Sequence, residues 1–201
     1  MSGLILGLLS AYLVGSIPTA YLLVQWTRRV DVRTVGSGNV GATNATRAAG
    51  PFIGLLVFLI DLAKGVVATI VLAPLLVHPS NQTIRLACGL AAVLGHSFPV
   101  FLKFRGGKGV ATTLGVLFGS GPVIAGMCLA VWLACFVPWR YVSVGSIGAA
   151  ITLPLTQLWT HRPPSEVLLG TALAVLVIAR HWSNIVRLME GQEHRIGRKN
   201  S

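Results

Sequence analysis

The sequence predicts an all-α integral membrane protein that crosses a bilayer several times. Of its 201 residues, 54% are hydrophobic and only 10% are charged, which is more apolar surface than a soluble domain of this size can bury. The apolar residues form runs near the length of about 20 that one crossing needs. The net charge is +11, and the basic residues gather between the runs. A water-soluble protein is excluded, and we expect anionic ligands, namely membrane lipids or phosphorylated substrates, and no nucleic acid.

Uncharged runs followed by basic residues predict the first crossings. The first run, residues 4–25, ends just before Arg28 and Arg29, and the positive-inside rule places that end in the cytoplasm and the N-terminus outside. Residues 51–77 form a second crossing that begins with a proline, a residue well tolerated at a helix start. Residues 84–102 form the third and return to a basic segment inside.

The run 110–137 is ambiguous, because as one helix it would be about 42 Å long, well over the hydrocarbon core of about 30 Å. The sequence Gly-Ser-Gly-Pro at 119–122 predicts a break near its middle. Two short crossings or a re-entrant pair there, followed by crossings at 143–160 and 166–178, keep the basic C-terminus cytoplasmic. We therefore expect about seven transmembrane helices, or alternatively five plus a re-entrant hairpin, in a single domain over residues 1–201.

The first polar segment, residues 35–47, has the composition of a phosphate cradle. Its glycines allow backbone N–H groups to approach an anion closely, and hydroxyls, amides and one arginine add donors. A dinucleotide fingerprint is excluded because a membrane span, rather than a β-strand, precedes the segment. A flexible polar loop is the plainer alternative. The candidate residues are Gly36, Ser37, Gly38, Asn39, Gly41, Thr43, Asn44 and Arg47.

The second polar segment, residues 103–112, places cations and glycines just before an apolar helix, where backbone N–H groups favour an anion. It is no Walker motif, because Gly109 rather than Ser or Thr follows Lys108. Ordinary flanking charge would account for the cations but not for the glycines. The candidate residues are Gly106, Gly107, Lys108, Gly109 and Thr112.

The third polar segment, residues 180–187, carries His181, Asn184 and Arg187 at helical spacing, so that one face can line a substrate pocket. A lone interfacial histidine is the alternative. Ser143, in a shorter inner segment, supplies a hydroxyl that could join this face.

Asp61 and Lys64 lie three residues apart inside the second crossing, where ionisable groups normally pair and face the bundle interior. They are either a buried structural pair or a pair that supports the site. With five acids in the chain, a carboxylate-bound metal is not expected, and we expect no cofactor.

Three stretches together resemble the signatures of the bacterial acyl-phosphate:glycerol-3-phosphate acyltransferases of the PlsY type. They are Gly36-Ser-Gly-Asn-Val-Gly-Ala-Thr-Asn44 with Arg47, Gly106-Gly-Lys-Gly-Val-Ala-Thr112, and His181-x-x-Asn184-Ile-x-Arg187-Leu-x-x-Gly191-x-Glu193. The resemblance covers essentially the whole chain. It implies a multi-pass enzyme of the bacterial inner membrane whose active site faces the cytoplasm.

The reaction implied by the resemblance is acyl transfer from acyl phosphate to the 1-hydroxyl of sn-glycerol 3-phosphate. The products are lysophosphatidic acid and phosphate, no acyl-enzyme forms, and the reaction is the first acylation of phospholipid synthesis. The soluble enzyme that makes acyl phosphate is an expected transient partner.

By the same resemblance, the first polar segment would hold acyl phosphate together with Lys108 and Thr112. Ser143, His181 and Asn184 would place glycerol 3-phosphate. We expect Ser37, Arg47, Lys108 and His181 to be catalytic, and the remaining candidates, including Arg187 and the glycines, to bind substrate. Either His181 or a substrate phosphate oxygen removes the hydroxyl proton, and the lack of a nearby acid favours the phosphate.

Two other functions fit the composition. A transporter of phosphate esters would also be basic and glycine-rich, but it would place its site at the midplane between repeated halves, and no repeat is evident. A noncatalytic membrane subunit would explain the basic C-terminal tail but would leave the first two polar segments without a role.

Overall fold

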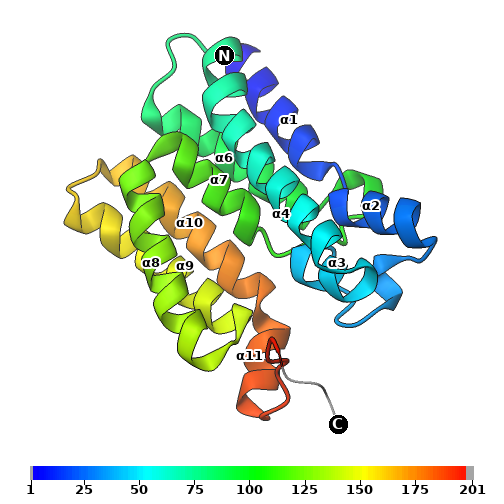
Figure 1. The fold of residues 1–201 in the computed structure, drawn as a ribbon. Coiled ribbons are helices and arrows are strands. Elements are labelled where there is room, and N and C mark those ends of the chain that lie inside the picture. The colour runs from blue at the N-terminus through cyan, green and yellow to red at the C-terminus, as the bar shows by residue number, and fades with distance from the viewer. Residues whose placement is uncertain (1, 198–201) are drawn as a thin grey trace. The chain divides into compact units, whose positions relative to one another are not determined.

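The structure is a computed structural model that describes residues 2–197, and these residues form helices and connecting segments without a strand. Contacts within the chain group it into two compact units, Met1–Ser120 and Gly121–Ser201 (Figure 1). The predicted all-α class is confirmed. Because candidate residues occur in both units, one functional domain over residues 1–201 remains our prediction.

The first unit begins with α1 (Ser2–Ser16) and α2 (Thr19–Arg28), which are separated at Ile17-Pro18. Proline lacks an N–H and restricts the residue before it, so the helix is interrupted there. The predicted crossing at 4–25 is therefore present, but as two helices. α1 packs along α6 (Gln82–Ser97).

Two further helices complete the frame of this unit. The 16-residue α4 (Pro51–Val66) begins at the proline, as predicted, and a π-helical turn (Val67–Leu72) joins it to α5 (Ala73–Leu76). α4 packs against α7 (Val110–Ser120). A short α3 (Ala42–Ala49) follows a 3₁₀ turn (Val32–Thr34) and packs against α2 and α4.

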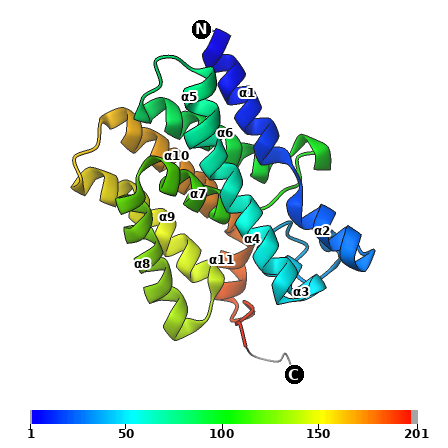
Figure 2. The same ribbon diagram turned by 45° about the horizontal axis from the view of Figure 1, so that its top comes forward.

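The second unit holds α8 (Pro122–Trp139), α9 (Val142–Trp159), α10 (Pro164–Arg180) and α11 (Trp182–Met189). α9 packs against both α8 and α10 (Figure 2). The last crossing was expected at 166–178, and α10 extends past this range to Arg180. The chain then bends by 54° between α10 and α11.

The predicted break at 119–122 occurs at Gly121, between α7 and α8. Within residues 2–197, five helical stretches are long and apolar enough to cross a membrane, and α10 with α11 would make a sixth. α7 has 11 residues, about 16 Å of helix or roughly half a hydrocarbon core. The expected total of seven would require α7 to cross as a short helix.

Large apolar side chains lie exposed along the outside of these helices. On α1, Ile5, Leu9 and Leu13 are 56%, 56% and 50% exposed, and they recur every fourth residue on one face. A soluble protein seldom leaves such a stripe in water. The stripe is typical of a helix that faces lipid.

Candidate functional site

The first polar segment is organised by Asn44, which lies in α3 and is only 1% exposed. Its amide nitrogen donates to the carbonyls of Val32 and Val35 at 2.8 and 3.0 Å, and its oxygen accepts from the backbone N–H of Ser37 at 3.0 Å. Satisfying buried backbone groups in this way fixes the shape of an otherwise irregular loop. Asn44 therefore fixes the backbone conformation of the first polar segment.

Two other candidates of this segment, Gly36 and Ser37, lie beside the Asn44 amide. Gly36 has φ +56°, a conformation that other residues adopt only with strain. A side chain at this position would also crowd the Asn44 oxygen and the Arg47 side chain. Ser37 and Arg47 are exposed, so a hydroxyl and a guanidinium at the rim of the cradle can contact an anion.

The second polar segment packs against the end of α6. The N–H of Gly106 donates to the carbonyl of Ser97 at 3.2 Å, and the N–H of Gly107 donates to the carbonyl of His96 at 3.1 Å. A Cβ on Gly107 would overlap the His96 ring on one side and the Val40 carbonyl on another. Since Val40 belongs to the first polar segment, the structure brings the first two segments together.

At the start of α7, the candidates divide into accessible and buried groups. Lys108 is partly exposed, whereas Thr112 is fully buried, beside the point where α7 closely approaches Gly65 of α4. The hydroxyls of Ser97 and Thr113 lie beside Gly109 and have no hydrogen-bond partner within residues 2–197. Buried hydroxyls of this kind usually have a partner, so they can serve an anion at the helix start. Sequence reasoning missed Ser97.

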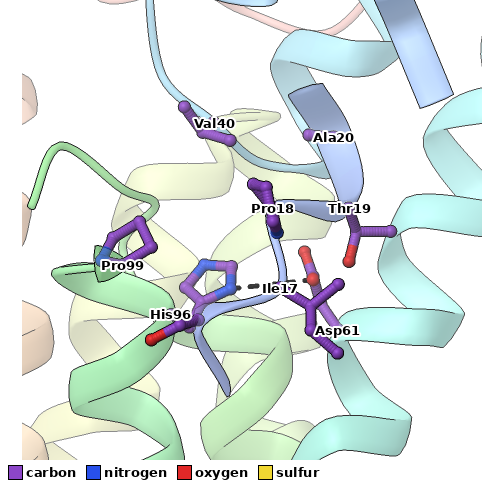
Figure 3. A pocket seen from close by; sticks show the side chains of 9 residues that line it. Ile17, Pro18, Thr19, Ala20, Val40, Asp61, His96 and Pro99 are labelled. Atoms are coloured by element: carbon purple, nitrogen blue, oxygen red, sulfur yellow. Dashed lines mark ion pairs between the residues drawn. The ribbon is translucent and has the colours of Figure 1, made fainter. Parts of the chain in front are cut away.

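Asp61 and Lys64 form the predicted pair, with 2.6 Å between Lys64 Nζ and Asp61 Oδ1. Sequence reasoning missed the third member, His96, whose Nδ1 lies 3.6 Å from the same oxygen (Figure 3). The three residues are 2%, 4% and 9% exposed. The cluster therefore links α4 and α6 in the interior, next to the first two polar segments.

In the second unit, three predicted site residues converge on one carboxylate, Glu193. Ser143 Oγ and Asn184 Nδ2 donate to its Oε1 at 2.9 and 2.6 Å, and Arg187 Nε donates to its Oε2 at 2.8 Å. Burial alone would raise the pKa of Glu193, but the donors from Asn184, Ser143 and Arg187 lower it below the ordinary value. Glu193 stands in the third sequence signature, yet sequence reasoning assigned it no role.

His181 lies at the bend between α10 and α11 and is 2% exposed. Its Nδ1 lies 2.7 Å from the Val177 carbonyl, which can only accept, so Nδ1 carries a proton. In the neutral ring Nε2 then bears the lone pair and can accept a proton. The bend and this hydrogen bond together orient the ring.

The chain is thus a multi-pass helical membrane protein. Its first unit contains two glycine-rich segments that contact each other and suit an anion, and its second unit contains polar side chains that donate to Glu193. The sequence profile described as glycerol-3-phosphate acyltransferase matches residues 5–191. Glycerol-3-phosphate acyltransferases from Syntrophomonas wolfei and Myxococcus xanthus are 44% and 46% identical, covering 94% and 93% of this chain and 95% and 96% of theirs. The chain belongs to the glycerol-3-phosphate acyltransferase family.

Solved structures agree with this assignment. A crystal structure of PlsY, an integral membrane glycerol 3-phosphate acyltransferase, in its glycerol 3-phosphate form superposes with a TM-score of 0.90 at 43% identity. Its lysophosphatidic acid form superposes with a TM-score of 0.86 at 41% identity. Each comparison covers 98% of this chain and 96% of the other. The transporter and the noncatalytic subunit are therefore set aside in favour of an acyltransferase.

Proposed function

We propose that this acyltransferase takes its acyl group from acyl phosphate and transfers it to the 1-hydroxyl of sn-glycerol 3-phosphate. The products are 1-acyl-sn-glycerol 3-phosphate and inorganic phosphate. The observation that carries the proposal is the packing of Gly107 against His96 and Val40, which joins two donor-rich segments. The PlsY structures named for glycerol 3-phosphate and lysophosphatidic acid support the acceptor and the product.

The proposed step is a direct transfer. The hydroxyl oxygen attacks the carbonyl carbon of acyl phosphate, the bond from that carbon to the phosphate oxygen breaks, and phosphate leaves with the electron pair. Arg47 and Lys108 stabilise the negative charge on the carbonyl oxygen and on the departing phosphate, with Ser37 as a further donor. Ser143, His181 and Asn184 place glycerol 3-phosphate, and no acyl-enzyme forms.

The hydroxyl proton passes to a phosphate oxygen of the substrate rather than to His181. The Nδ1 partner of His181 is the carbonyl of Val177, whereas in Ser-His-Asp enzymes a carboxylate accepts from the corresponding nitrogen and stabilises an imidazolium. Phosphate is already a good leaving group, and the reaction needs little help from a strong base. His181 then serves to bind the acceptor.

The donor is tested with purified protein in lipid nanodiscs. Palmitoyl phosphate with sn-glycerol 3-phosphate should yield lysophosphatidic acid and phosphate in equal amounts, whereas palmitoyl-CoA should yield neither. Lys108→Gln should lower the rate by at least about 100-fold. Lys103→Gln, in the same segment but exposed, should retain it. Product from palmitoyl-CoA alone would overturn the proposal.

We further propose that the protein lies in the bacterial inner membrane with its active site facing the cytoplasm, in contact with the soluble enzyme that makes acyl phosphate. The positive-inside distribution of Lys and Arg supports this orientation. Single cysteines at His161 and Asn200, in a variant with serine at the native cysteines, test it. A membrane-impermeant reagent applied from outside should label His161→Cys only, and labelling of Asn200→Cys would reverse the orientation.

A further inference from the structure

A buried charged cluster beneath the first two polar segments has no part in the transfer described above. Lys64 Nζ donates to Asp61 Oδ1 and to the carbonyl of Ile17, both at 2.6 Å. Ile17 lies at the break between α1 and α2, where the regular helical hydrogen bonds are interrupted, and its carbonyl also accepts from the N–H of Thr19 at 2.9 Å. Lys64 thus neutralises the charge of Asp61 and links α4 to the break between α1 and α2 by a hydrogen bond.

His96 connects the cluster to the second polar segment. Its Nδ1 faces Asp61 at 3.6 Å, while its Nε2 is the atom that a Cβ on Gly107 would meet first. The His96 carbonyl accepts from the Gly107 N–H. One edge of the ring therefore faces the buried acid, and the opposite edge supports the glycine backbone.

The surroundings of the ring make its orientation depend on Asp61. A small cavity borders the ring and is lined also by Ser16, Thr19 and Pro99 (Figure 3). The hydroxyls of Ser16 and Thr19 are buried without a hydrogen-bond partner in residues 2–197. Beside such a space, an imidazole that lost its partner would be able to turn away from Gly107.

Energetics also argue against a purely stabilising role. A buried ion pair costs desolvation free energy that the attraction between its charges often fails to recover. A protein with apolar residues of similar size at these positions would therefore be as stable. Apolar residues would not direct an imidazole toward a glycine. The benefit of the cluster therefore lies in geometry.

We propose that Asp61 is a positioning residue that acts through His96 to hold Gly106 and Gly107 against Val40, and that this contact shapes the binding site for a substrate phosphate group. The ligand chemistry is a phosphate monoester or an acyl phosphate. This inference rests on the proposed function for the identity of the substrates, but the positioning of the segment is measurable without turnover.

The test uses Asp61→Asn, which keeps the shape of the side chain and removes its charge. We expect the KM of palmitoyl phosphate, of sn-glycerol 3-phosphate or of both to rise on the order of 10- to 100-fold, as for a displaced binding group. Separate titrations of the two substrates show which phosphate the segment holds. Amide hydrogen exchange of residues 103–110 should become faster.

Glu166→Gln is the matched control, because Glu166 is a buried acid of α10 with Arg162 3.9 Å away. It should leave both KM values and the exchange of residues 103–110 unchanged. His96→Gln, which leaves Asp61 and Lys64 paired, should reproduce the Asp61→Asn effects and carries the test if Asp61→Asn does not fold. Because Asp61 acts through His96, the double variant should be no worse than the more impaired single variant.

Unchanged KM values and unchanged exchange in folded Asp61→Asn and His96→Gln would overturn the inference, as would equal effects in Glu166→Gln. If the wild-type protein makes no product from palmitoyl phosphate, the proposed donor fails. The exchange of residues 103–110 then still decides whether Asp61 positions the segment.

Discussion

The side-chain amide of Asn184 donates a 2.6 Å hydrogen bond to Glu193, which also accepts from Ser143 and Arg187. One buried carboxylate thereby sets the positions of three side chains expected to bind substrate. Through Ser143, Glu193 also ties the segment after α11 to the first turn of α9. The N–H of Ile196 adds a hydrogen bond of 3.0 Å to the carbonyl of Arg140, which lies between α8 and α9. Loss of the Glu193 carboxylate should therefore affect activity and stability together.

Glu193→Gln should lower the rate of acyl transfer by at least about tenfold and the stability by about 1–3 kcal/mol, because an amide cannot accept from all three donors and leaves buried polar groups unpaired. The rate is measured by phosphate release and the stability by thermal unfolding in detergent. Glu190→Gln is the control, since Glu190 is exposed, and it should change neither quantity. Equal behaviour of the two variants would contradict this role for Glu193.

A fall in pH should lower the stability of the protein through the same residue, Glu193. The folded pKa of Glu193 lies below its ordinary value of 4.5, so its contribution to stability is complete above that value and is lost as the pH falls through the folded pKa. The melting temperature should drop below about pH 4.5 more steeply in the wild type than in Glu193→Gln. If the melting temperatures of the wild type and Glu193→Gln change in parallel over pH 3–7, Glu193 contributes nothing to the loss of stability in acid.

Asn44→Asp should disrupt the first polar segment. The new carboxylate would face the carbonyls of Val32 and Val35, to which the amide now donates, and a buried acceptor without a donor costs about 1–3 kcal/mol. Activity should fall by more than about tenfold. Thr46→Ala, which removes the hydroxyl and methyl of an exposed side chain whose hydroxyl bonds within its own helix, should retain activity. A fully active Asn44→Asp enzyme would exclude the organising role.

Gly107→Ala tests the contact between the first two polar segments. The added methyl group would overlap the His96 ring and the Val40 carbonyl, so the backbone must shift, and activity should fall roughly 10- to 100-fold. Gly126→Ala adds the same methyl group in α8 where nothing lies within 4 Å, and it should be silent. If both variants are silent, the close approach of the segments does not matter for catalysis.

His181→Gln distinguishes the two routes for the proton. Glutamine can still donate to the Val177 carbonyl and accept from the substrate, but it cannot act as a base near neutral pH. We expect substantial turnover with a pH–rate profile of unchanged shape, because substrate phosphate takes the proton. If the wild-type pH–rate profile has a limb near the ordinary histidine pKa of about 6.5 and His181→Gln lacks that limb, His181 is instead the base.

Much of the architecture could be predicted from local patterns. Hydropathy and the positions of Pro51 and Gly121 indicated where helices begin and break, because both effects act within a few residues. The first three spans were expected at 4–25, 51–77 and 84–102, and the structure has helical stretches at Ser2–Arg28, Pro51–Leu76 and Gln82–Leu102. The bend between α10 and α11 was missed, because no proline marks it.

The sequence by itself determined the membrane class, the polar segments and the family, because composition and motif order are properties of the chain alone. It also paired Asp61 with Lys64, three residues away on one helix face. Only the tertiary structure decided that Asn44 satisfies the backbone of its own cradle, that His96 joins Asp61 and supports Gly107, and that Glu193 gathers donors from as far as 50 residues away. Such partners meet through the packing of helices distant in sequence, which no local periodicity records.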